Sequence, residues 1–175
     1  MTVQMQANKA FDVQDIERLV QDHQVHRDVY TSQDVYALEM QHLFANVWVF
    51  VGHESQTPKH GDYFTTQIGS QPVIQVRHSD GGVKVLHNRC PHKGTKIAID
   101  RHGNTGTFFR CPYHAWSFET DGRLKAVPLE SGYSNTSFET TENANGIKPV
   151  GAVHNHRGFV FTRLAESGIS FDDFF

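Results

Sequence analysis

The stretches Cys90-Pro91-His92-Lys93-Gly94 and Cys111-Pro112-Tyr113-His114-Ala115-Trp116 contain both cysteines of this 175-residue chain. Each stretch offers one thiol and one imidazole on a short segment, so together they supply four metal-binding side chains. Two Cys and two His can bind a tetrahedral zinc ion, or a 2Fe–2S cluster in which both histidines bind the same iron. The residue types alone leave both possibilities open.

The spacing of these residues favours the cluster. A zinc finger usually groups its two cysteines in one knuckle and its two histidines on a helix. Here each motif carries one residue of each type, so each could give a sulfur to one iron and a nitrogen to the other. A proline after each cysteine stiffens the segment, and Gly94 permits a tight backbone turn. A disulfide between Cys90 and Cys111 would need an oxidising compartment, and no signal-like apolar stretch opens the chain.

The two motifs resemble the cluster loops of the Rieske non-haem iron oxygenases, and more narrowly the N-terminal domain of the large, or alpha, subunit of aromatic-ring-hydroxylating oxygenases. The resemblance covers residues 30–165. Outside the motifs it rests on residues 44–53, Gly61-Asp62-Tyr63-Phe64, Asp121-Gly122-Arg123-Leu124 and Val127-Pro128. One departure is a longer gap between the motifs, for which we expect a hairpin insertion around Arg101-His102-Gly103-Asn104.

The resemblance implies a role for each residue of the motifs. Cys90 and Cys111 are expected to bind one iron of a Rieske-type 2Fe–2S cluster, and His92 and His114 the other. In the family, the second-loop histidine hydrogen-bonds across a subunit boundary to an acidic residue that leads to the catalytic iron, and this relay role falls on His114. Trp116 is expected to shield the cluster from water, or to be an ordinary core tryptophan. Lys93 is expected to be a charge near the cluster, or simply a solvated side chain.

We expect a mainly β fold with an N-terminal α-helical arm: a Rieske 2Fe–2S antiparallel β-sandwich with the cluster in two loops at one tip. The arm is placed at residues 1–46 and the Rieske domain at residues 47–165. Residues 166–175 are expected to begin a C-terminal catalytic domain that is cut off, because Ser170 resembles the N-cap of a helix.

The periodicity of apolar residues predicts the individual elements. Helical spacing predicts helices over residues 12–24 and 32–46, the second one N-capped by Ser32. Asp121-Gly122 and Asn155-His156 are expected to form hairpin turns. Alternating and β-branched runs predict strands at residues 63–68, 73–77, 83–87, 107–110, 116–119, 123–127, 151–154 and 158–163.

The function implied by the resemblance is electron transfer. In the family, electrons pass from NAD(P)H through a flavin reductase, with or without a ferredoxin, to the Rieske cluster. They continue to a mononuclear Fe(II) ion in the C-terminal domain, where O2-dependent aromatic hydroxylation takes place. The family also implies a homo-oligomer, a trimer, with or without a small beta subunit. The alternatives are a stand-alone Rieske ferredoxin and a Cys2His2 zinc-stabilised binding module.

Composition agrees with this interpretation. The net charge is −3, and no basic stripe or long apolar run occurs in the sequence, so we expect neither a nucleic acid nor a membrane as partner. Two thiols assigned to iron are compatible with a reducing compartment, and we expect the bacterial cytoplasm.

The residues around the motifs predict a low reduction potential. Rieske proteins of respiratory complexes carry an additional Cys pair, and a Ser and a Tyr that donate hydrogen bonds to sulfur. Tyr113, Trp116 and Phe118 occupy the corresponding positions of the second motif here. Since fewer donors stabilise the additional electron less, we expect a midpoint potential of about −150 mV, at the low end of the Rieske range. A redox titration followed by EPR measures it, and a value in the positive hundreds of millivolts would contradict the prediction.

Overall fold

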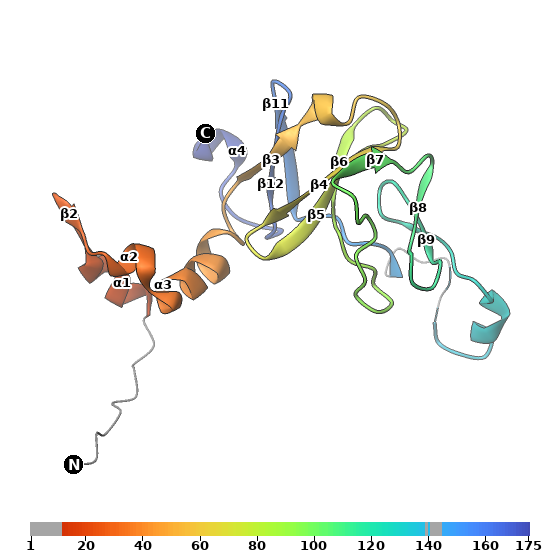
Figure 1. Ribbon diagram of the computed structural model, residues 1–175, viewed down its shortest axis with the longest axis horizontal. Helices are drawn as coiled ribbons and strands as arrows, with labels where there is room; N and C mark the ends of the chain where they lie inside the picture. Colours follow the sequence, from red (N-terminus) through yellow and green to blue (C-terminus); the bar gives the residue numbers. More distant parts are fainter. Residues whose placement is uncertain (1–11, 139, 141–144) are drawn as a thin grey trace, which may run out of the picture. The chain divides into compact units, whose positions relative to one another are not determined.

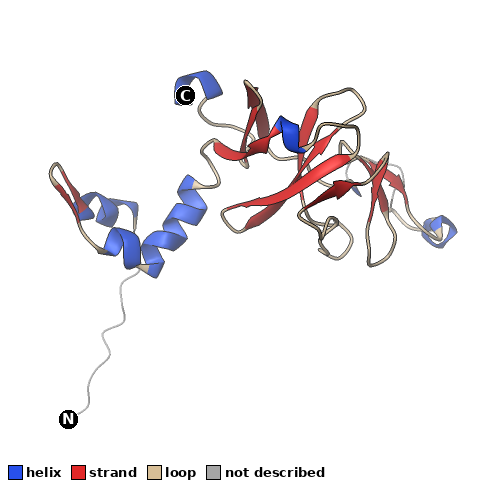
Figure 2. Ribbon diagram, turned by 45° about the horizontal axis from the view of Figure 1, so that its top comes forward, coloured by secondary structure: helices blue, strands red, loops and turns tan. Residues whose placement is uncertain are grey.

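The computed structural model describes residues 12–138, 140 and 145–175, and the chain divides into two compact units, Met1–Phe44 and Ala45–Phe175. The second unit consists of short antiparallel strands joined by longer loops (Figure 2). The predicted fold class, a mainly β domain of antiparallel sheets, is confirmed, and the helices are few and short. Among the described residues, no helix is long and apolar enough to span a bilayer.

The first predicted helix is shorter than expected. Helix α1 covers Val13–Leu19, and Asp12 caps it by accepting a hydrogen bond from the backbone N–H of Asp15 at 2.9 Å. The chain then folds back as the two-residue strands β1 (Val20–Gln21) and β2 (Gln24–Val25). The prediction of a helix through residue 24 is therefore wrong, because β-branched Val20 and Val25 pair in the extended conformation that such residues favour.

The second predicted helix begins where expected and ends differently. Ser32 is the N-cap of α3 (Gln33–Leu38), since its side chain accepts from the backbone N–H of Val35. The helix then continues as the π-helical turn η1 (Glu39–Leu43). A further short helix, α2 (Asp28–Thr31), precedes Ser32 and was not predicted.

A four-stranded antiparallel sheet lies at the centre of the second unit (Figure 1). Its strands are β4 (Asp62–Ile68), β5 (Gln71–Arg77), β6 (Val83–His87) and β7 (His102–Asn104), in the order β6-β5-β4-β7. The first three strands confirm the runs predicted from the sequence. The four central residues of β5, Val73 to Val76, are buried, so this strand is covered on both faces.

Between the two motifs, the residues at which we expect an insertion do not form a separate hairpin. Residues 102–104 form the edge strand β7, which pairs with the start of β4 from Asp62 to Phe64. The side chain of Asn104 fixes this edge by donating to the carbonyl of His60 at 2.9 Å and to a carboxylate oxygen of Asp62 at 2.8 Å. The gap between the motifs is therefore used for a strand of the central sheet.

The second sheet carries the second motif. It consists of β8 (Phe108–Arg110), β9 (Ser117–Glu119) and β10 (Leu124–Ala126), in the order β10-β9-β8. The predicted turn at Asp121-Gly122 is confirmed. Gly122 has φ +97, and a Cβ atom there would lie 2.3 Å from the carbonyl oxygen of Ile147, so only glycine fits this turn.

The third sheet consists of β3 (Val49–His53), β11 (Ala152–His156) and β12 (Phe159–Arg163), in the order β11-β12-β3. Strand β3 was not predicted. The last hairpin turns at Arg157 and Gly158, which have φ of 53 and 91, and not at Asn155-His156. Asn155 belongs to β11, and its side-chain oxygen accepts from the N–H of Gly158 at 2.8 Å.

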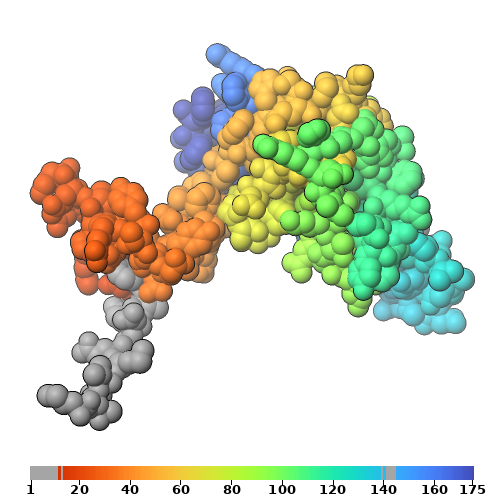
Figure 3. Space-filling view, viewed as in Figure 1, coloured from red at the N-terminus to blue at the C-terminus, as the bar shows by residue number. Residues whose placement is uncertain are grey.

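Two groups of buried side chains fill the spaces between the sheets. The smaller group lies beside β3 and β12 and contains Val51, Ile68, Val73, Val85, Val150 and Val160. The larger group contains Ile74, Val76, Leu86, Cys90, Ile97, Ala98, Phe109, Cys111, Trp116, Phe118, Leu124, Val127 and Ile147. Both motif cysteines therefore belong to the apolar core. In Figure 3, the surface of the second unit around this larger group is coloured green and turquoise.

The helix predicted at Ser170 is present as α4 (Phe171–Phe174), with Ser170 as its N-cap. Phe171 is buried and stacks on the ring of His154 at 3.9 Å between centroids. Phe175 contacts the rings of Phe171 and His156 at 5.2 and 4.9 Å.

Candidate metal centre

The two motifs form two loops with the same backbone geometry, side by side at one edge of the second unit (Figure 1). The first loop follows β6, and the second joins β8 to β9. In the first, the N–H of Cys90 donates to the carbonyl of Thr95 at 2.8 Å, and the N–H of Gly94 donates to the carbonyl of Cys90 at 2.9 Å. In the second, the N–H of Cys111 donates to the carbonyl of Trp116 at 2.8 Å, and the N–H of Ala115 donates to the carbonyl of Cys111 at 3.0 Å.

This shared geometry requires a left-handed residue four positions after each cysteine. Gly94 has φ +78, which glycine adopts without penalty, whereas Ala115 has φ 58. A non-glycine residue in this region is strained by about 1–2 kcal/mol. The second loop therefore stores conformational strain that the first loop avoids.

The two thiols are buried next to each other. Cys90 and Cys111 are 2% and 3% exposed, both are free of disulfides, and their side chains are within hydrogen-bonding distance. Burial raises the pKa of the Cys90 thiol, and proximity to Cys111 acts in the same direction. The backbone N–H groups of His92 and Lys93 donate to the Cys90 sulfur and favour its thiolate. Two thiolates in this position need a cation to compensate their charge.

The two imidazoles lie together outside the thiols. The ring centroids of His92 and His114 are 4.8 Å apart, with His92 half-buried and His114 exposed. Burial lowers the pKa of His92, and His114 and Lys93 act in the same direction, so the neutral ring that binds metals is favoured. The ring of Tyr113 lies 3.7 Å from that of His114.

Trp116 contacts this site directly. It is 5% exposed and stacks on His92 at 4.7 Å with an interplanar angle of 4°. Its other neighbour is Phe138, at 5.3 Å, and Phe138 in turn contacts Tyr133 at 4.8 Å. Trp116 is thus a core residue that also covers the ring of His92 and keeps water from it. By contrast, the side chain of Lys93 is exposed.

This arrangement fits a binuclear cluster better than a single ion. Two buried sulfurs on one side and two paired imidazoles on the other offer two ligands to each of two iron atoms, as a Rieske-type cluster requires. A structural zinc site would need all four donors to converge on one point. In the described part of the chain, no group of three or more His, Cys, Asp or Glu side chains converges in this way.

Asn88 is a residue of the site that the sequence did not reveal. Its buried side chain donates to the carbonyl of Ala98 at 2.7 Å and accepts from the N–H groups of Ile97 and Ala98 at 2.8 and 3.0 Å. These three bonds connect the entry of the first loop to the segment that follows it. No sequence pattern indicates such a role, and the only signal is that Asn88 lies two residues before Cys90.

Comparison with known proteins identifies the domain type. The family described as "Rieske [2Fe-2S] domain" matches residues 47–140. The chain is 37% identical over 153 residues to the glycine betaine monooxygenase oxygenase subunit of Chromohalobacter salexigens, covering 87% of this chain and 33% of that protein. It is 33% identical over 175 residues to the benzene 1,2-dioxygenase subunit alpha of Pseudomonas putida, covering 99% of this chain and 38% of that protein.

Solved structures agree. The naphthalene 1,2-dioxygenase from Rhodococcus sp., whose crystal structure has indole bound, superposes with a TM-score of 0.80 at 28% identity, over 90% of this chain and 35% of that one. This chain thus spans about a third of the length of the proteins that it matches.

Replacing Asn88 by Ala should destabilise the first loop. Three buried polar groups of Ile97 and Ala98 would lose their partner, at a cost of about 2–4 kcal/mol. Urea unfolding, and the rate at which the visible absorbance of the bound cluster bleaches, measure the effect. Asn104→Ala is the matched control: its side chain also makes three hydrogen bonds, but at an exposed edge where water replaces them. Equal effects of the two variants would contradict the role given to Asn88.

Replacing Ala115 by Gly should stabilise the second loop by about 1 kcal/mol, because it relieves the left-handed strain at this position. The reciprocal change, Gly94→Ala, should destabilise the first loop, since its Cβ would also lie 3.3 Å from the Nε of Arg89. Urea unfolding midpoints of the two variants and the original chain test both effects. A loss of stability in Ala115→Gly would show that φ 58 carries no strain here.

Proposed function

Because this chain belongs to the Rieske 2Fe–2S domain family and is related to the alpha subunits of Rieske non-haem iron oxygenases, we propose that it is the electron-relay domain of such an oxygenase. The observation that carries the proposal is the pairing of two buried thiols with two adjacent imidazoles at the tip of the domain. The relatives are oxygenase subunits, which favours this function over a stand-alone ferredoxin. The Rieske domain family is defined by a 2Fe–2S cluster, which disfavours the alternative of a zinc-stabilised binding module.

In this proposal, Cys90 and Cys111 hold one iron of the cluster, and His92 and His114 hold the other. When bound, a 2Fe–2S cluster supplies a one-electron carrier of moderate potential. The core around the thiols excludes water from the sulfur side. Trp116 fixes the plane of the His92 ring by stacking on it, while the exposed ring of His114 is available to a neighbouring acceptor group. His114 is therefore the residue through which we expect electrons to leave.

For the whole protein, we propose O2-dependent hydroxylation at a mononuclear Fe(II) ion, with electrons from NAD(P)H through a flavin reductase, a ferredoxin, or both. An aromatic substrate is supported by the benzene dioxygenase relative, which aligns over almost all of this chain. The betaine monooxygenase relative has a similar identity, so likeness to these relatives does not by itself distinguish an aromatic substrate from a betaine. We also propose a homo-oligomer, a trimer, in the bacterial cytoplasm.

The test is an EPR spectrum of the dithionite-reduced chain together with iron and sulfide analysis. We expect two irons and two inorganic sulfides per chain, and a rhombic signal whose average g value is lower than that of an all-cysteine cluster. His114→Cys should retain a cluster with a lower potential and a higher average g value, because a charged thiolate replaces a neutral imidazole. It should also abolish electron transfer in the complete oxygenase.

His102→Cys is the matched control for this variant. His102 is also exposed, but it lies in edge strand β7 outside the two loops, so its replacement should leave the EPR signal and the potential unchanged. Zinc bound without sulfide in the original chain would disprove the proposed function. An unchanged spectrum in His114→Cys would remove His114 from the set of ligands.

A further inference from the structure

The two imidazoles of the candidate metal centre are held in different ways. His92 is half-buried, and its ring stacks on Trp116 with an interplanar angle of 4°. Since Trp116 is itself part of the core, the packing of the core fixes the plane of this pair. His114 is exposed, so the core does not orient its ring. Whatever holds the ring of His114 therefore lies at the surface of the second loop.

Hydrogen bonds to the described residues do not hold the ring of His114. Within the part of the chain that the structure describes, neither ring nitrogen of His114 donates or accepts a hydrogen bond, whereas those of His53 and His78 do. A metal-binding histidine usually donates its second ring N–H to a carboxylate or a carbonyl, and this bond fixes the orientation of the ring. The orientation of His114 needs another source.

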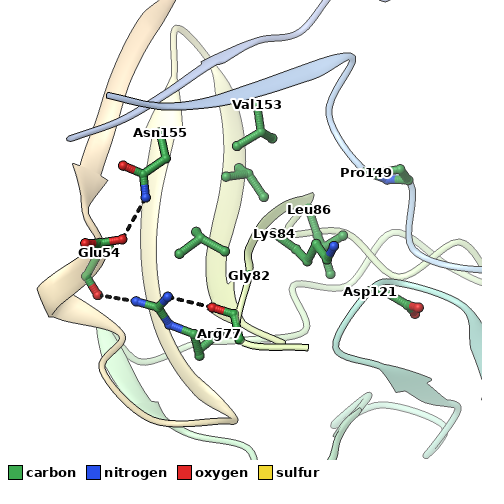
Figure 4. Close-up of a pocket in the computed structure, with 12 residues that line it drawn as sticks. Glu54, Arg77, Gly82, Lys84, Leu86, Asp121, Pro149, Val153 and Asn155 are labelled. Carbon is green, nitrogen blue, oxygen red and sulfur yellow. Dashed lines mark hydrogen bonds between the residues drawn. The ribbon is translucent and has the colours of Figure 1, made fainter. Parts of the chain in front are cut away.

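Polar side chains elsewhere in the same unit are fixed by such bonds. In a cleft of about 470 Å³, Arg77 donates to the carbonyls of Glu54 and Gly81 at 2.9 and 2.8 Å (Figure 4). In the same cleft, the side chain of Asn155 donates to the carboxylate of Glu54 at 2.7 Å. These bonds give each side chain a defined direction. For His114, only contacts between rings remain among the described residues.

The closest of these contacts is with the ring of Tyr113. The centroids of Tyr113 and His114 are 3.7 Å apart with an interplanar angle of 35°, whereas the ring of His92 is 4.8 Å away at 65°. Tyr113 is 63% exposed, and His114 is its one ring contact among the described residues. Because paired aromatic rings attract each other beyond the area that they bury, this contact accounts for the position of an exposed tyrosine ring.

The matched geometry of the two loops shows what is particular about Tyr113. When the two cysteines are aligned, Tyr113 corresponds to His92, and His114 corresponds to Lys93. The candidate ligand is thus the second residue after the cysteine in the first loop and the third in the second loop. The other position holds the exposed Lys93 in the first loop and an aromatic ring in the second. Of the two loops, only the second places a ring beside its own histidine.

We propose that Tyr113 is a positioning residue, which holds the imidazole of His114 in a fixed plane by stacking on it. This inference rests on the proposed function, in which His114 binds iron. A stacked ring restricts the rotation of the imidazole without forming a hydrogen bond to its second nitrogen. The orientation of His114 is thus set within its own loop, while that nitrogen stays available to a partner. The role belongs to the ring of Tyr113 and not to its hydroxyl.

The test compares Tyr113→Ala with Tyr113→Phe in the cluster-loaded full chain. EPR of the dithionite-reduced chains gives the g values and line widths, and ENDOR resolves the couplings of the two iron-bound nitrogens. We expect Tyr113→Ala to keep two irons and two sulfides but to broaden the EPR signal about twofold, because the His114 ring would adopt several orientations. One of the two nitrogen couplings should broaden with it. Tyr113→Phe should match the original chain, because it keeps the aromatic ring.

Tyr30→Ala is the matched control. Tyr30 is also exposed, at 78%, but it lies in α2 of the first unit, so its replacement should change neither spectrum. Urea unfolding separates positioning from general stability. Since most of the Tyr113 side chain is in contact with water, we expect the unfolding midpoint of Tyr113→Ala to equal that of the original chain within error.

Three results would overturn the positioning role. The first is an EPR signal with nitrogen couplings that are unchanged in Tyr113→Ala. The second is a Tyr113→Phe variant that is altered as strongly as Tyr113→Ala, since the hydroxyl would then be the important group. The third is loss of the cluster from Tyr113→Ala together with a lower unfolding midpoint, which would indicate a purely structural role.

The same measurements separate this inference from the proposed function. If the original chain gives no signal of mixed histidine and cysteine ligation, the proposed function fails, and the role of Tyr113 fails with it. A Rieske signal in the original chain that Tyr113→Ala leaves unchanged keeps the proposed function and rejects the positioning role alone.

Discussion

The contact between the thiols of Cys90 and Cys111 is the constraint on which the rest of the domain depends. These residues are on loops that follow strands of two different sheets, yet they must bury two potential negative charges side by side at the end of an apolar core. The fold meets this requirement by giving both loops the same closing hydrogen bonds and by packing Phe109, Phe118 and Leu86 beneath them. A centre that depends on two loops is rigid only if both are held independently, and this is why each loop has its own support.

The supports of the two loops differ. The first loop is held by the buried amide of Asn88, which connects its start to Ile97 and Ala98. The second is held by the strands on either side of it, which pair directly as β8 and β9. The same difference is reflected in the backbone, because the first loop uses glycine at its left-handed position and the second tolerates alanine. A hairpin closed by two paired strands can sustain a strained residue that a longer excursion could not.

The sequence was most informative where a residue type is required by local chemistry. The two motifs, the N-cap at Ser32 and the turn at Asp121-Gly122 could all be predicted, because thiols, capping hydroxyls and positive φ angles leave few alternatives. It was least informative where tertiary pairing decides. Strand β3 and edge strand β7 exist because other strands accept them, and residues 20–25 leave the helix for a hairpin despite their periodicity. The role of Asn88 depends on how the segment after the first loop folds back to Ile97 and Ala98, so no sequence pattern could indicate it.

The chain has only two tryptophans, and the fold places them in very different surroundings. Trp116 stacks on His92, whereas Trp48 packs against Phe171 and beneath the guanidinium of Arg163, beside the third sheet. An iron–sulfur cluster absorbs light in the range in which tryptophan emits, and energy transfer to it weakens steeply with distance. The emission of Trp116, which contacts His92 directly, should therefore be suppressed in every molecule that holds a cluster. The tryptophan fluorescence of a sample should therefore report the fraction of chains that hold a cluster.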